Sequence, residues 1–288
     1  MNFLLLDFGA SRIKSVIYNA KLKKFSSIYS TNGPFIIGKD IIKLSFFSNS
    51  FQDHLKFHSA QNNKIDAINM CCEMHGFVLV GEDRNIYDEY YVSWRSINNN
   101  FLKKDLFNFF PDNDFKDITG MNFRDGLPVT NVSMYTDKNR KYRFMGICES
   151  LALIHGNWHG KISKSIAASS GLFDISKKNW INSLTIFPNV KFPEVCEEKD
   201  NIYGDIKIEN KNVPIYGCIG DLQASYFSIE MNDKSININL GTGSQVSKKY
   251  FEGDEKLFEI RPMFNEDYFT TVSHIPCGRV LDIYSNFF

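Results

Sequence analysis

Two stretches of the sequence constrain the fold more than any other feature, because each places a polar turn directly after an apolar run. The stretch 213–223 is an apolar run that ends in Gly-Asp and leads into a helical pattern. The stretch 236–247 is a second apolar run that ends in Gly-Thr-Gly-Ser and then reverses, which predicts a strand, a turn and a strand. Asp221 would then lie at the carboxyl end of a buried strand, beside a glycine turn whose N–H groups can hold a phosphate. We therefore expect a base next to a phosphate site.

A third turn of this kind lies near the N-terminus, within the stretch 3–18. It predicts a strand, a tight turn at Gly9 and a second strand, with Asp7 before the turn and Ser11 and Lys14 after it. An acid, a glycine turn and a hydroxyl are what a phosphate–Mg²⁺ site requires. A plain β-hairpin with a surface aspartate is the alternative, and this stretch alone leaves it open.

The charge balance argues against nucleic acid as a partner, and the short apolar runs argue against a membrane. The 288 residues contain 33 basic and 33 acidic side chains, and no basic block that could follow a nucleic-acid backbone. Asp7 interrupts the apolar start too early for a signal peptide, and no later run is long enough to span a membrane. We expect a cytoplasmic protein with a well-buried core.

The cysteines and histidines show no metal-binding pattern. None of the six cysteines forms a C-x-x-C pair, and Cys71 and Cys72 are adjacent in an apolar strand-like run, which favours core packing in a reducing compartment. His54 and His58 have the spacing of a solvated helix face. We interpret them as surface residues rather than ligands.

Two further patterns suit a ligand, and the second of them suits a sugar. The stretch 65–80 predicts two strands that meet at Met-His-Gly, so that His75 would lie at the strand ends, where α/β folds bind ligands. A histidine satisfied within its own turn is the alternative. Trp94 and Arg95 place an apolar ring beside hydroxyl-binding donors, although buried aromatic packing with a surface arginine explains them equally well.

The remaining elements predict helices and one domain boundary. Helices are expected over 101–115 and 142–154, around Trp180 and over 277–288. The polar turn 209–212 is the best boundary. It predicts one domain over 1–212 and a second over 213–288.

Six short motifs, taken in order, resemble one enzyme family. They are Asp7-Phe8-Gly9-Ala10-Ser11, Met74-His75-Gly76, Trp94-Arg95, Ala168-Ser169-Ser170-Gly171-Leu172-Phe173-Asp174, Gly220-Asp221-Leu222-Gln223 and Gly241-Thr242-Gly243-Ser244. Their order resembles that of the FGGY carbohydrate kinases, which include glycerol kinase, xylulokinase and sedoheptulokinase. Arg261-Pro262 and Cys277-Gly278-Arg279 are similar to the sedoheptulokinase-like branch.

The resemblance implies a fold and an activity. The fold would be the α/β actin-like ATPase (ribonuclease H-like) fold, with one complete N-terminal domain and the start of a C-terminal one. The activity would be transfer of the ATP γ-phosphoryl group to a hydroxyl of a ketose or polyol, with Mg²⁺ as the second cofactor. Each motif would then carry part of this reaction.

The resemblance also assigns residues. Asp221 would be the general base. The residues implied to hold the sugar are His75, Gly76, Trp94, Arg95 and Gln223. Those implied to hold the phosphates and Mg²⁺ are Asp7, which would also bind the metal, with Gly9, Ser11, Lys14, Gly241, Thr242 and Gly243.

Three departures from the family pattern favour an alternative. The usual Trp-x-Asp-x-Arg segment is contracted to Trp94-Arg95, and Ser163-Lys164 stands where relatives have Thr-Asp. FGGY kinases are also longer, and the adenosine pocket would lie in the part that this sequence lacks. The alternative is therefore a truncated, inactive relative that binds a sugar or a partner. Two protein partners stay open: a second copy of the chain, or a second polypeptide that completes the C-terminal domain.

Overall fold

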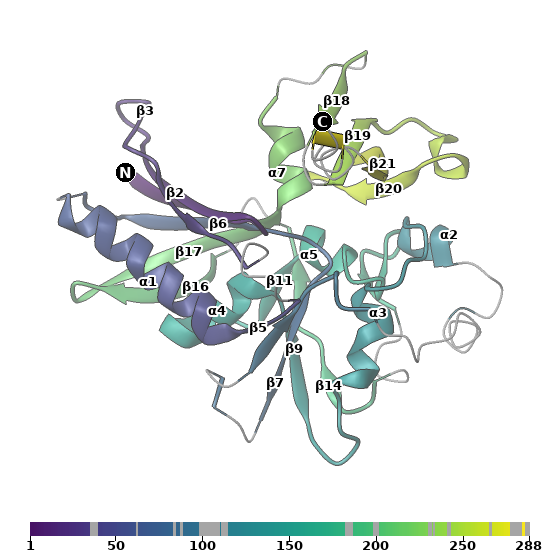
Figure 1. Cartoon of the computed structure of the whole chain (residues 1–288), viewed down its shortest axis with the longest axis horizontal. Coiled ribbons are helices and arrows are strands. Elements are labelled where there is room, and N and C mark those ends of the chain that lie inside the picture. Colours follow the sequence, from purple (N-terminus) through teal and green to yellow (C-terminus); the bar gives the residue numbers. More distant parts are fainter. Residues whose placement is uncertain are drawn as a thin grey trace.

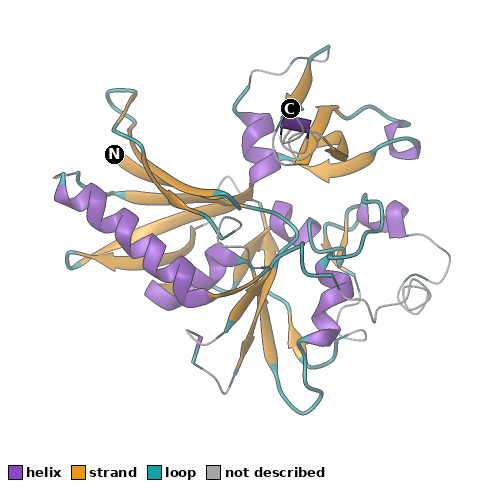
Figure 2. Cartoon of the chain, viewed as in Figure 1, coloured by secondary structure: helices purple, strands orange, loops and turns teal. Residues whose placement is uncertain are grey.

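The computed structural model has two lobes of unequal size (Figure 1). It describes residues 1–34, 40–61, 63–82, 85–86, 89–97, 110, 115–181, 187–197, 202–229, 232, 234–240, 243–264, 267–276 and 284–285. The large lobe consists of the described residues before 221, and the small lobe consists of those from 221 to 276. In Figure 2 both lobes combine strands with helices.

The main sheet of the large lobe is mixed, and its central strands are parallel. Within the described residues its order is β10-β16-β17-β6-β1-β2-β3, with β4 also paired to β2. The strands are β1 (Asn2–Phe8), β2 (Arg12–Asn19), β3 (Lys24–Phe25), β4 (Tyr29–Asn32), β6 (Ala67–Cys72), β10 (Gly156–Trp158), β16 (Ile202–Ile208) and β17 (Lys211–Gly220). β1 and β17 both run parallel to β6 between them, so their carboxyl ends meet at one edge.

Two helices cover one face of this sheet, as Figure 1 shows. They are α1 (Leu44–Ala60) and α4 (Ile147–His155). Alternate residues of β1, namely Leu4, Leu6 and Phe8, are buried in the core on this side. Phe3, Leu5 and Asp7 therefore point to the opposite face, which carries the candidate site.

A second sheet and several short elements complete the large lobe. The second sheet has the order β14-β9-β7-β8-β5, from β5 (Ile41–Lys43), β7 (Phe77–Gly81), β8 (Tyr90–Val92), β9 (Tyr142–Met145) and β14 (Val190–Lys191). The short elements are α2 (Phe115–Thr119), α3 (Pro128–Asn131), β11 (Lys161–Ser163), α5 (Lys164–Ala168), β12 (Phe173–Asp174), β13 (Asn179–Trp180) and β15 (Glu194–Cys196).

The small lobe begins where the main sheet ends. Its helix α7 (Asp221–Phe227) follows β17 directly, and its sheet has the order β18-β19-β21-β20. The strands are β18 (Ile236–Asn239), β19 (Gly243–Lys249), β20 (Glu259–Pro262) and β21 (Tyr268–Pro276). The helix packs on the sheet through Tyr226 and Phe269, whose stacked rings lie 4.8 Å apart. The predicted boundary between residues 212 and 213 falls near the start of β17, and the domain division stays a prediction.

Most predicted strands are confirmed, but two predicted helices are wrong in part. Residues 142–145 form β9, because Tyr142 and Phe144 alternate towards the core and the 3.6-residue spacing starts only at Ile147. Trp180 lies in the short strand β13, where its ring nitrogen donates to the carbonyl of Pro193. The predicted helices 101–115 and 277–288 fall largely outside the described residues.

The prediction that His54 and His58 are on the surface is wrong. Both lie on α1 as expected, yet both side chains are fully buried against β2. The hydroxyl of Ser15 lies 2.6 Å from Nδ1 of His54 and 2.8 Å from Nε2 of His58. Nε2 of His54 contacts the hydroxyl of Thr31 at 3.1 Å. The helix therefore binds the sheet through a buried polar network that its own sequence does not reveal.

This network makes the fold sensitive to acid. Burial and the nearby charge of His58 lower the pKa of His54 from 6.5 to about 4. The unfolded chain therefore binds this proton first as the pH falls, so stability is complete above pH 6.5 and is lost towards pH 4. This lowering of the pKa predicts a loss of up to about 3 kcal/mol from His54 alone.

Urea unfolding between pH 7 and pH 4.5 measures this dependence. Replacing His54 by leucine should flatten it. Equal slopes for the His54→Leu variant and the wild type would show that other groups control the acid sensitivity.

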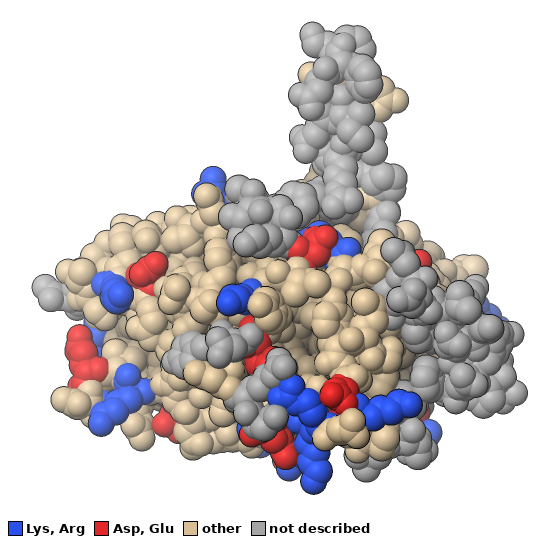
Figure 3. Space-filling view, turned by 60° about the horizontal axis from the view of Figure 1, so that its bottom comes forward, with Lys and Arg blue, Asp and Glu red and all other residues tan. Residues whose placement is uncertain are grey.

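On the face shown in Figure 3, basic and acidic side chains are interspersed, with no extended basic patch among the described residues. No helix in the described ranges combines the length and the apolar character needed to cross a membrane.

Candidate functional site

Asp7 and Asp221 meet at the edge of the main sheet where the central strands end. Asp7 lies opposite Cys71 in the pairing of β1 with β6, and Ile219 lies opposite Cys71 in the pairing of β17 with β6. Asp221 follows two residues later, at the first position of α7. The carboxyl ends of parallel strands are where α/β sheets bind ligands.

Both carboxylates line one large cavity. It has a volume of about 1050 Å³ and lies between the main sheet and the small lobe. Lys14 also lines it, directly across β1–β2 from Asp7. The rest of the wall is largely apolar and includes Phe3, Leu5, Val16, Tyr216, Ile219, Phe227 and Phe264. Asn69 and Ser225 add polar groups that the sequence interpretation missed.

The cavity holds its acids in a protonation state suited to proton transfer. Asp221 can be reached from the cavity, but the protein around it removes bulk water. This burial, together with the negative charges of Cys72, Glu73 and Asp7, raises the pKa of Asp221 to about 7. Burial also raises the pKa of Asp7, although the Lys14 ammonium opposes that shift. A carboxylate with a pKa near 7 can take and release a proton at neutral pH.

The first glycine turn is tightly packed. A Cβ on Gly9 would lie 2.9 Å from the carbonyl oxygen of Arg12, which is too close. The carbonyl of Ser11 accepts the N–H of Gly33 at 2.9 Å, which holds the turn against the following loop. Gly241 and Thr242 lie outside the described residues, and the backbone of Gly243 begins β19, where it pairs with Pro276. Their phosphate-binding roles, like those of Gly9 and Ser11, stay predictions.

His75 lies at the junction of β6 and β7 with an unusual backbone. Its φ of 65° is in the left-handed region, and its N–H donates to the hydroxyl of Ser169 at 3.2 Å. Nδ1 lies 2.7 Å from the carbonyl oxygen of Ser169 and must donate to it, which leaves Nε2 as an acceptor. Burial and the positive charges of Arg261 and Arg124 hold the pKa of His75 well below 6.5. The imidazole is therefore neutral and can accept a hydroxyl proton.

Gly76 is required by close packing. A Cβ at this position would lie 1.9 Å from the hydroxyl of Tyr91, whose ring is buried in the core. We predict that Gly76→Ala destabilises the fold by about 3 kcal/mol, at the upper end of the overpacking range. Urea unfolding measures this loss.

Gly160→Ala is the matched control for this substitution. Gly160 has a φ of 76°, but nothing lies within 4 Å of the position that a methyl group there would occupy, so only backbone strain of about 1 kcal/mol is expected. Equal losses at the two glycines would contradict the packing role of Gly76.

Arg95 binds two acids instead of standing free beside Trp94. Its Nη1 lies 3.3 Å from Oε2 of Glu73 and its Nε lies 3.3 Å from Oδ1 of Asp40. The guanidinium carbon is also 5.4 Å from the centre of the Trp94 ring. Trp94 and Arg95 therefore form one stacked unit held by Glu73. Its predicted contact with a sugar stays a prediction.

Gln223 is buried in the small lobe. Its side-chain nitrogen donates to the carbonyl of Pro262 at 3.2 Å, which ties α7 to β20. None of His75, Gly76, Trp94, Arg95 and Gln223 lines the cavity of Asp7 and Asp221 described above. The structure thus brings together the predicted base, the predicted metal ligand and Lys14 in one cavity wall, of which the predicted sugar residues form no part.

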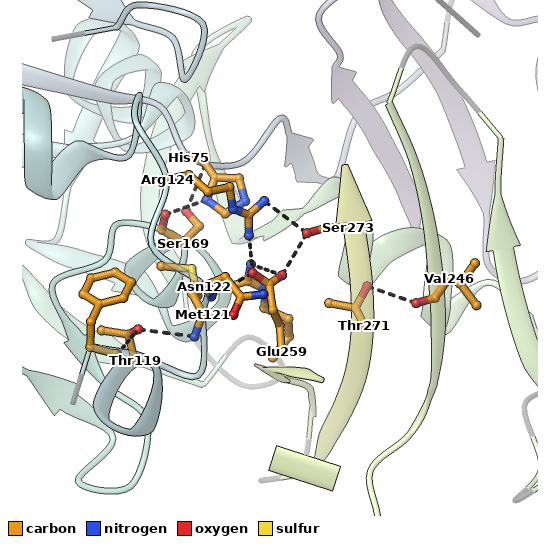
Figure 4. Close-up of polar contacts among 12 residues, drawn as sticks. His75, Thr119, Met121, Asn122, Arg124, Ser169, Val246, Glu259, Thr271 and Ser273 are labelled. Atoms are coloured by element: carbon orange, nitrogen blue, oxygen red, sulfur yellow. Dashed lines mark hydrogen bonds and ion pairs between the residues drawn. The ribbon is translucent and has the colours of Figure 1, made fainter. Parts of the chain in front are cut away.

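A buried ion-pair network joins the two lobes, as Figure 4 shows. Glu259 of β20 accepts the N–H of Asn122 at 2.8 Å and pairs with Arg124, both from the large lobe. Its second oxygen lies 3.2 Å from Nη2 of Arg261 and accepts the hydroxyl of Ser273 at 2.8 Å. Sequence patterns did not reveal these residues, apart from the motif that contains Arg261.

Searches against protein-family models and against curated proteins find no match. Solved structures do match. The xylulose kinase from Rhodospirillum rubrum has a TM-score of 0.81 at 11% identity, with 100% of this chain and 63% of that chain covered. The gluconate kinase from Lactobacillus acidophilus has a TM-score of 0.73 at 17% identity, covering 95% of this chain and 60% of that one. The Plasmodium falciparum glycerol kinase with ADP has a TM-score of 0.74 at 16% identity, covering 99% and 63%.

These similarities establish the fold. The matched proteins are FGGY carbohydrate kinases with the actin-like ATPase fold, so the expected fold class is confirmed. The chain spans about 60% of the length of the structures that it matches.

Proposed function

We propose that this chain is an ATP-dependent carbohydrate kinase that transfers the γ-phosphoryl group to a hydroxyl of a ketose or polyol, such as a sedoheptulose-like sugar. The observation that carries the proposal is the pair of acids, Asp7 and Asp221, in the wall of one cavity at the strand ends. The matched structures, which include xylulose, gluconate and glycerol kinases, support the same reaction class. The acceptor would therefore be a small polyhydroxylated molecule.

Asp221 would act as the general base. Its carboxylate would take the proton of the attacking hydroxyl as the oxygen bonds to the γ-phosphorus, and ADP would leave. The pKa of about 7 suits this role, because a weaker base would not hold the proton and a stronger one would already be protonated at neutral pH. Lys14 adds a positive charge to the same wall, where phosphate oxygens would lie.

Asp7 would bind a magnesium ion at the cavity wall that it shares with Asp221. The negative charges of the two aspartates repel each other, which contributes to the raised pKa of Asp221, and a divalent cation would relieve that repulsion. Mg²⁺ prefers one or two carboxylates together with phosphate oxygens. When bound, it would neutralise the charge of the phosphates.

His75 is the best-supported contact for the sugar. Its neutral ring has Nε2 free of the Ser169 contact, and a sugar hydroxyl is a donor of the kind that this nitrogen accepts. Closure of the small lobe on the large one would bring the sugar and the nucleotide together and exclude water.

A sugar-binding or partner-binding relative without turnover is the second candidate. The ion pairs of Arg95 with Glu73 and Asp40 favour this candidate, because they make the guanidinium less available to a substrate. A protein partner would fit the edge strand β18, on which Ile236 and Ile238 are 62% and 60% exposed. That partner would be a second polypeptide or a second copy of the chain.

A sugar panel with ATP and Mg²⁺ separates the two candidates. ADP release and the mass of the sugar phosphate are measured for ketoses, polyols and sugar acids, and calorimetry measures binding of ATP–Mg²⁺ and of each sugar. Sugar-dependent ADP release supports the kinase. Sugar binding without nucleotide binding or turnover supports the second candidate, and the absence of all three contradicts both.

A further inference from the structure

Three buried cysteine side chains meet in the core, on the far side of the main sheet from the acid-lined cavity. Cys72 ends β6, Cys218 lies on β17, and Cys148 lies in the first turn of α4. Their sulfur atoms all lie within 4.8 Å of one another, and those of Cys72 and Cys218 are 3.6 Å apart. Each of the three side chains is at most 2% exposed. The three residues come from three elements that are distant in the sequence.

These separations match those of a thiolate metal site. Zinc binds cysteine sulfur at about 2.3 Å, which places the sulfurs of a tetrahedral site about 3.8 Å apart. The pair at 3.6 Å already has that spacing, and the limit of 4.8 Å leaves the third sulfur within a side-chain rotation of it. Soft thiolates select zinc and related thiophilic ions over magnesium.

Glu149 provides an independent observation that points to a cation. It follows Cys148 in the first turn of α4, is 1% exposed, and interacts electrostatically with Cys72. Its Oε2 accepts the N–H of Gly146 at 3.0 Å, but its Oε1 is buried without a hydrogen-bond partner among the described residues. A buried carboxylate oxygen without a partner costs stability. Three thiols that only pack as small apolar groups would not compensate the Glu149 carboxylate, whereas a nearby cation would.

We propose that Cys72, Cys148 and Cys218 bind a zinc ion through their three sulfur atoms. Each coordinating cysteine releases its proton when the metal binds, because the thiolate is the ligand. The three thiolates would fill three of the four positions of a tetrahedral zinc ion. The ion would join β6, β17 and α4, and so fix the ends of the two strands that lead to Cys71 and Asp221.

The proposed site is separate from the acid-lined cavity. Cys71 lines that cavity, and Cys72, as the next residue of the same strand, points to the opposite face. The zinc site therefore does not depend on the proposed kinase function. A chain without kinase activity could still contain it.

Metal analysis of the purified chain tests the proposal. The full chain, expressed with zinc and passed over a desalting column in chelator, should retain about one zinc ion per chain by mass spectrometry. Cobalt exchanged into the wild type should give the intense near-ultraviolet absorption of thiolate-to-cobalt charge transfer. The variants Cys148→Ser and Cys218→Ser should lose the zinc and the absorption, whereas Cys196→Ser, a half-buried cysteine outside the cluster, should keep both.

The cobalt spectrum of the wild type decides the outcome even if a cysteine variant fails to fold. A folded wild-type chain that retains no zinc and shows no charge-transfer absorption would overturn the site, and so would retention of copper in place of zinc. Zinc that survives Cys148→Ser unchanged would also overturn it. Glu149→Gln should weaken zinc retention without abolishing it, because three thiolates remain.

Discussion

Replacing Asp221 by asparagine is expected to lower kcat/KM for sugar phosphorylation by about 10²- to 10⁴-fold, the usual contribution of a positioned general base. The amide has almost the same shape as the carboxylate but cannot take a proton. In the wild type, kcat/KM should rise about tenfold per pH unit on the acid side and level off near pH 7, because the pKa of Asp221 is raised to about 7. The variant should lose this acid limb.

The stability of the Asp221→Asn variant shows whether a loss of activity comes from the missing base or from a loss of folding. The raised pKa means that the folded chain holds this proton more tightly than the unfolded chain, so stability falls as the pH rises from 3.8 to about 7 and the cost is complete above pH 7. Asparagine removes that cost, and the variant should unfold at the same or a higher temperature than the wild type at pH 8. Equal turnover by both proteins would rule out Asp221 as the base. A loss of activity together with a lower unfolding temperature would assign the effect to folding.

The parts of the site that could be predicted from sequence are those with a local signal. The β1–β2 hairpin and the step from β17 into α7 are both read from apolar runs that end at a glycine. That Asp7 and Asp221 lie near each other follows from topology, because parallel strands on either side of β6 end at one edge. The sequence alone could suggest this meeting only through the order of the motifs.

The parts that could not be predicted depend on partners distant in the chain. The sequence of the helix alone predicts that His54 and His58 lie on the surface. Their contact with Ser15 forms only because β2 packs against the helix. Arg95 was expected to face a sugar, but Glu73 holds it from 22 residues away. The three sulfurs of Cys72, Cys148 and Cys218 gather from strands and a helix that no sequence spacing links. In each case neither the periodicity of the sequence nor the spacing of its residues indicates which residue the side chain contacts.

The largest predicted loss of stability comes from replacing Glu259, because this carboxylate neutralises the buried Arg261 and the partly buried Arg124 at the junction of the lobes. Burial alone would raise the pKa of Glu259, but Arg261 and Arg124 lower it to about 2. Arg261 is 1% exposed, and its Nε and Nη1 have no hydrogen-bond partner among the described residues. Glu259 is therefore its main source of compensation.

We predict that Glu259→Gln destabilises the chain by about 3–5 kcal/mol, because it leaves the buried Arg261 cation without its partner and also breaks the ion pair with Arg124. The small lobe should also become sensitive to protease, since Glu259 accepts the N–H of Asn122 and pairs with Arg124 across the junction. Urea unfolding measures the first effect, and limited proteolysis followed by mass spectrometry locates the second. Glu252→Gln, the same change at an exposed acid of the small lobe, should alter neither.

A triple variant separates the cost of breaking the ion pair from the net contribution of the whole network to the free energy of unfolding. Replacing Glu259, Arg124 and Arg261 together by methionine removes every charge and keeps most of the buried volume. Buried ion pairs replaced in this way are often neutral or stabilising, so the triple variant should recover most of the stability lost in Glu259→Gln. A Glu259→Gln variant within about 1 kcal/mol of the wild type would mean that water reaches the arginines and that the junction is not a dry contact. In that case the two lobes would be held by the backbone contact of Ile260 with Gly120 and by apolar packing instead.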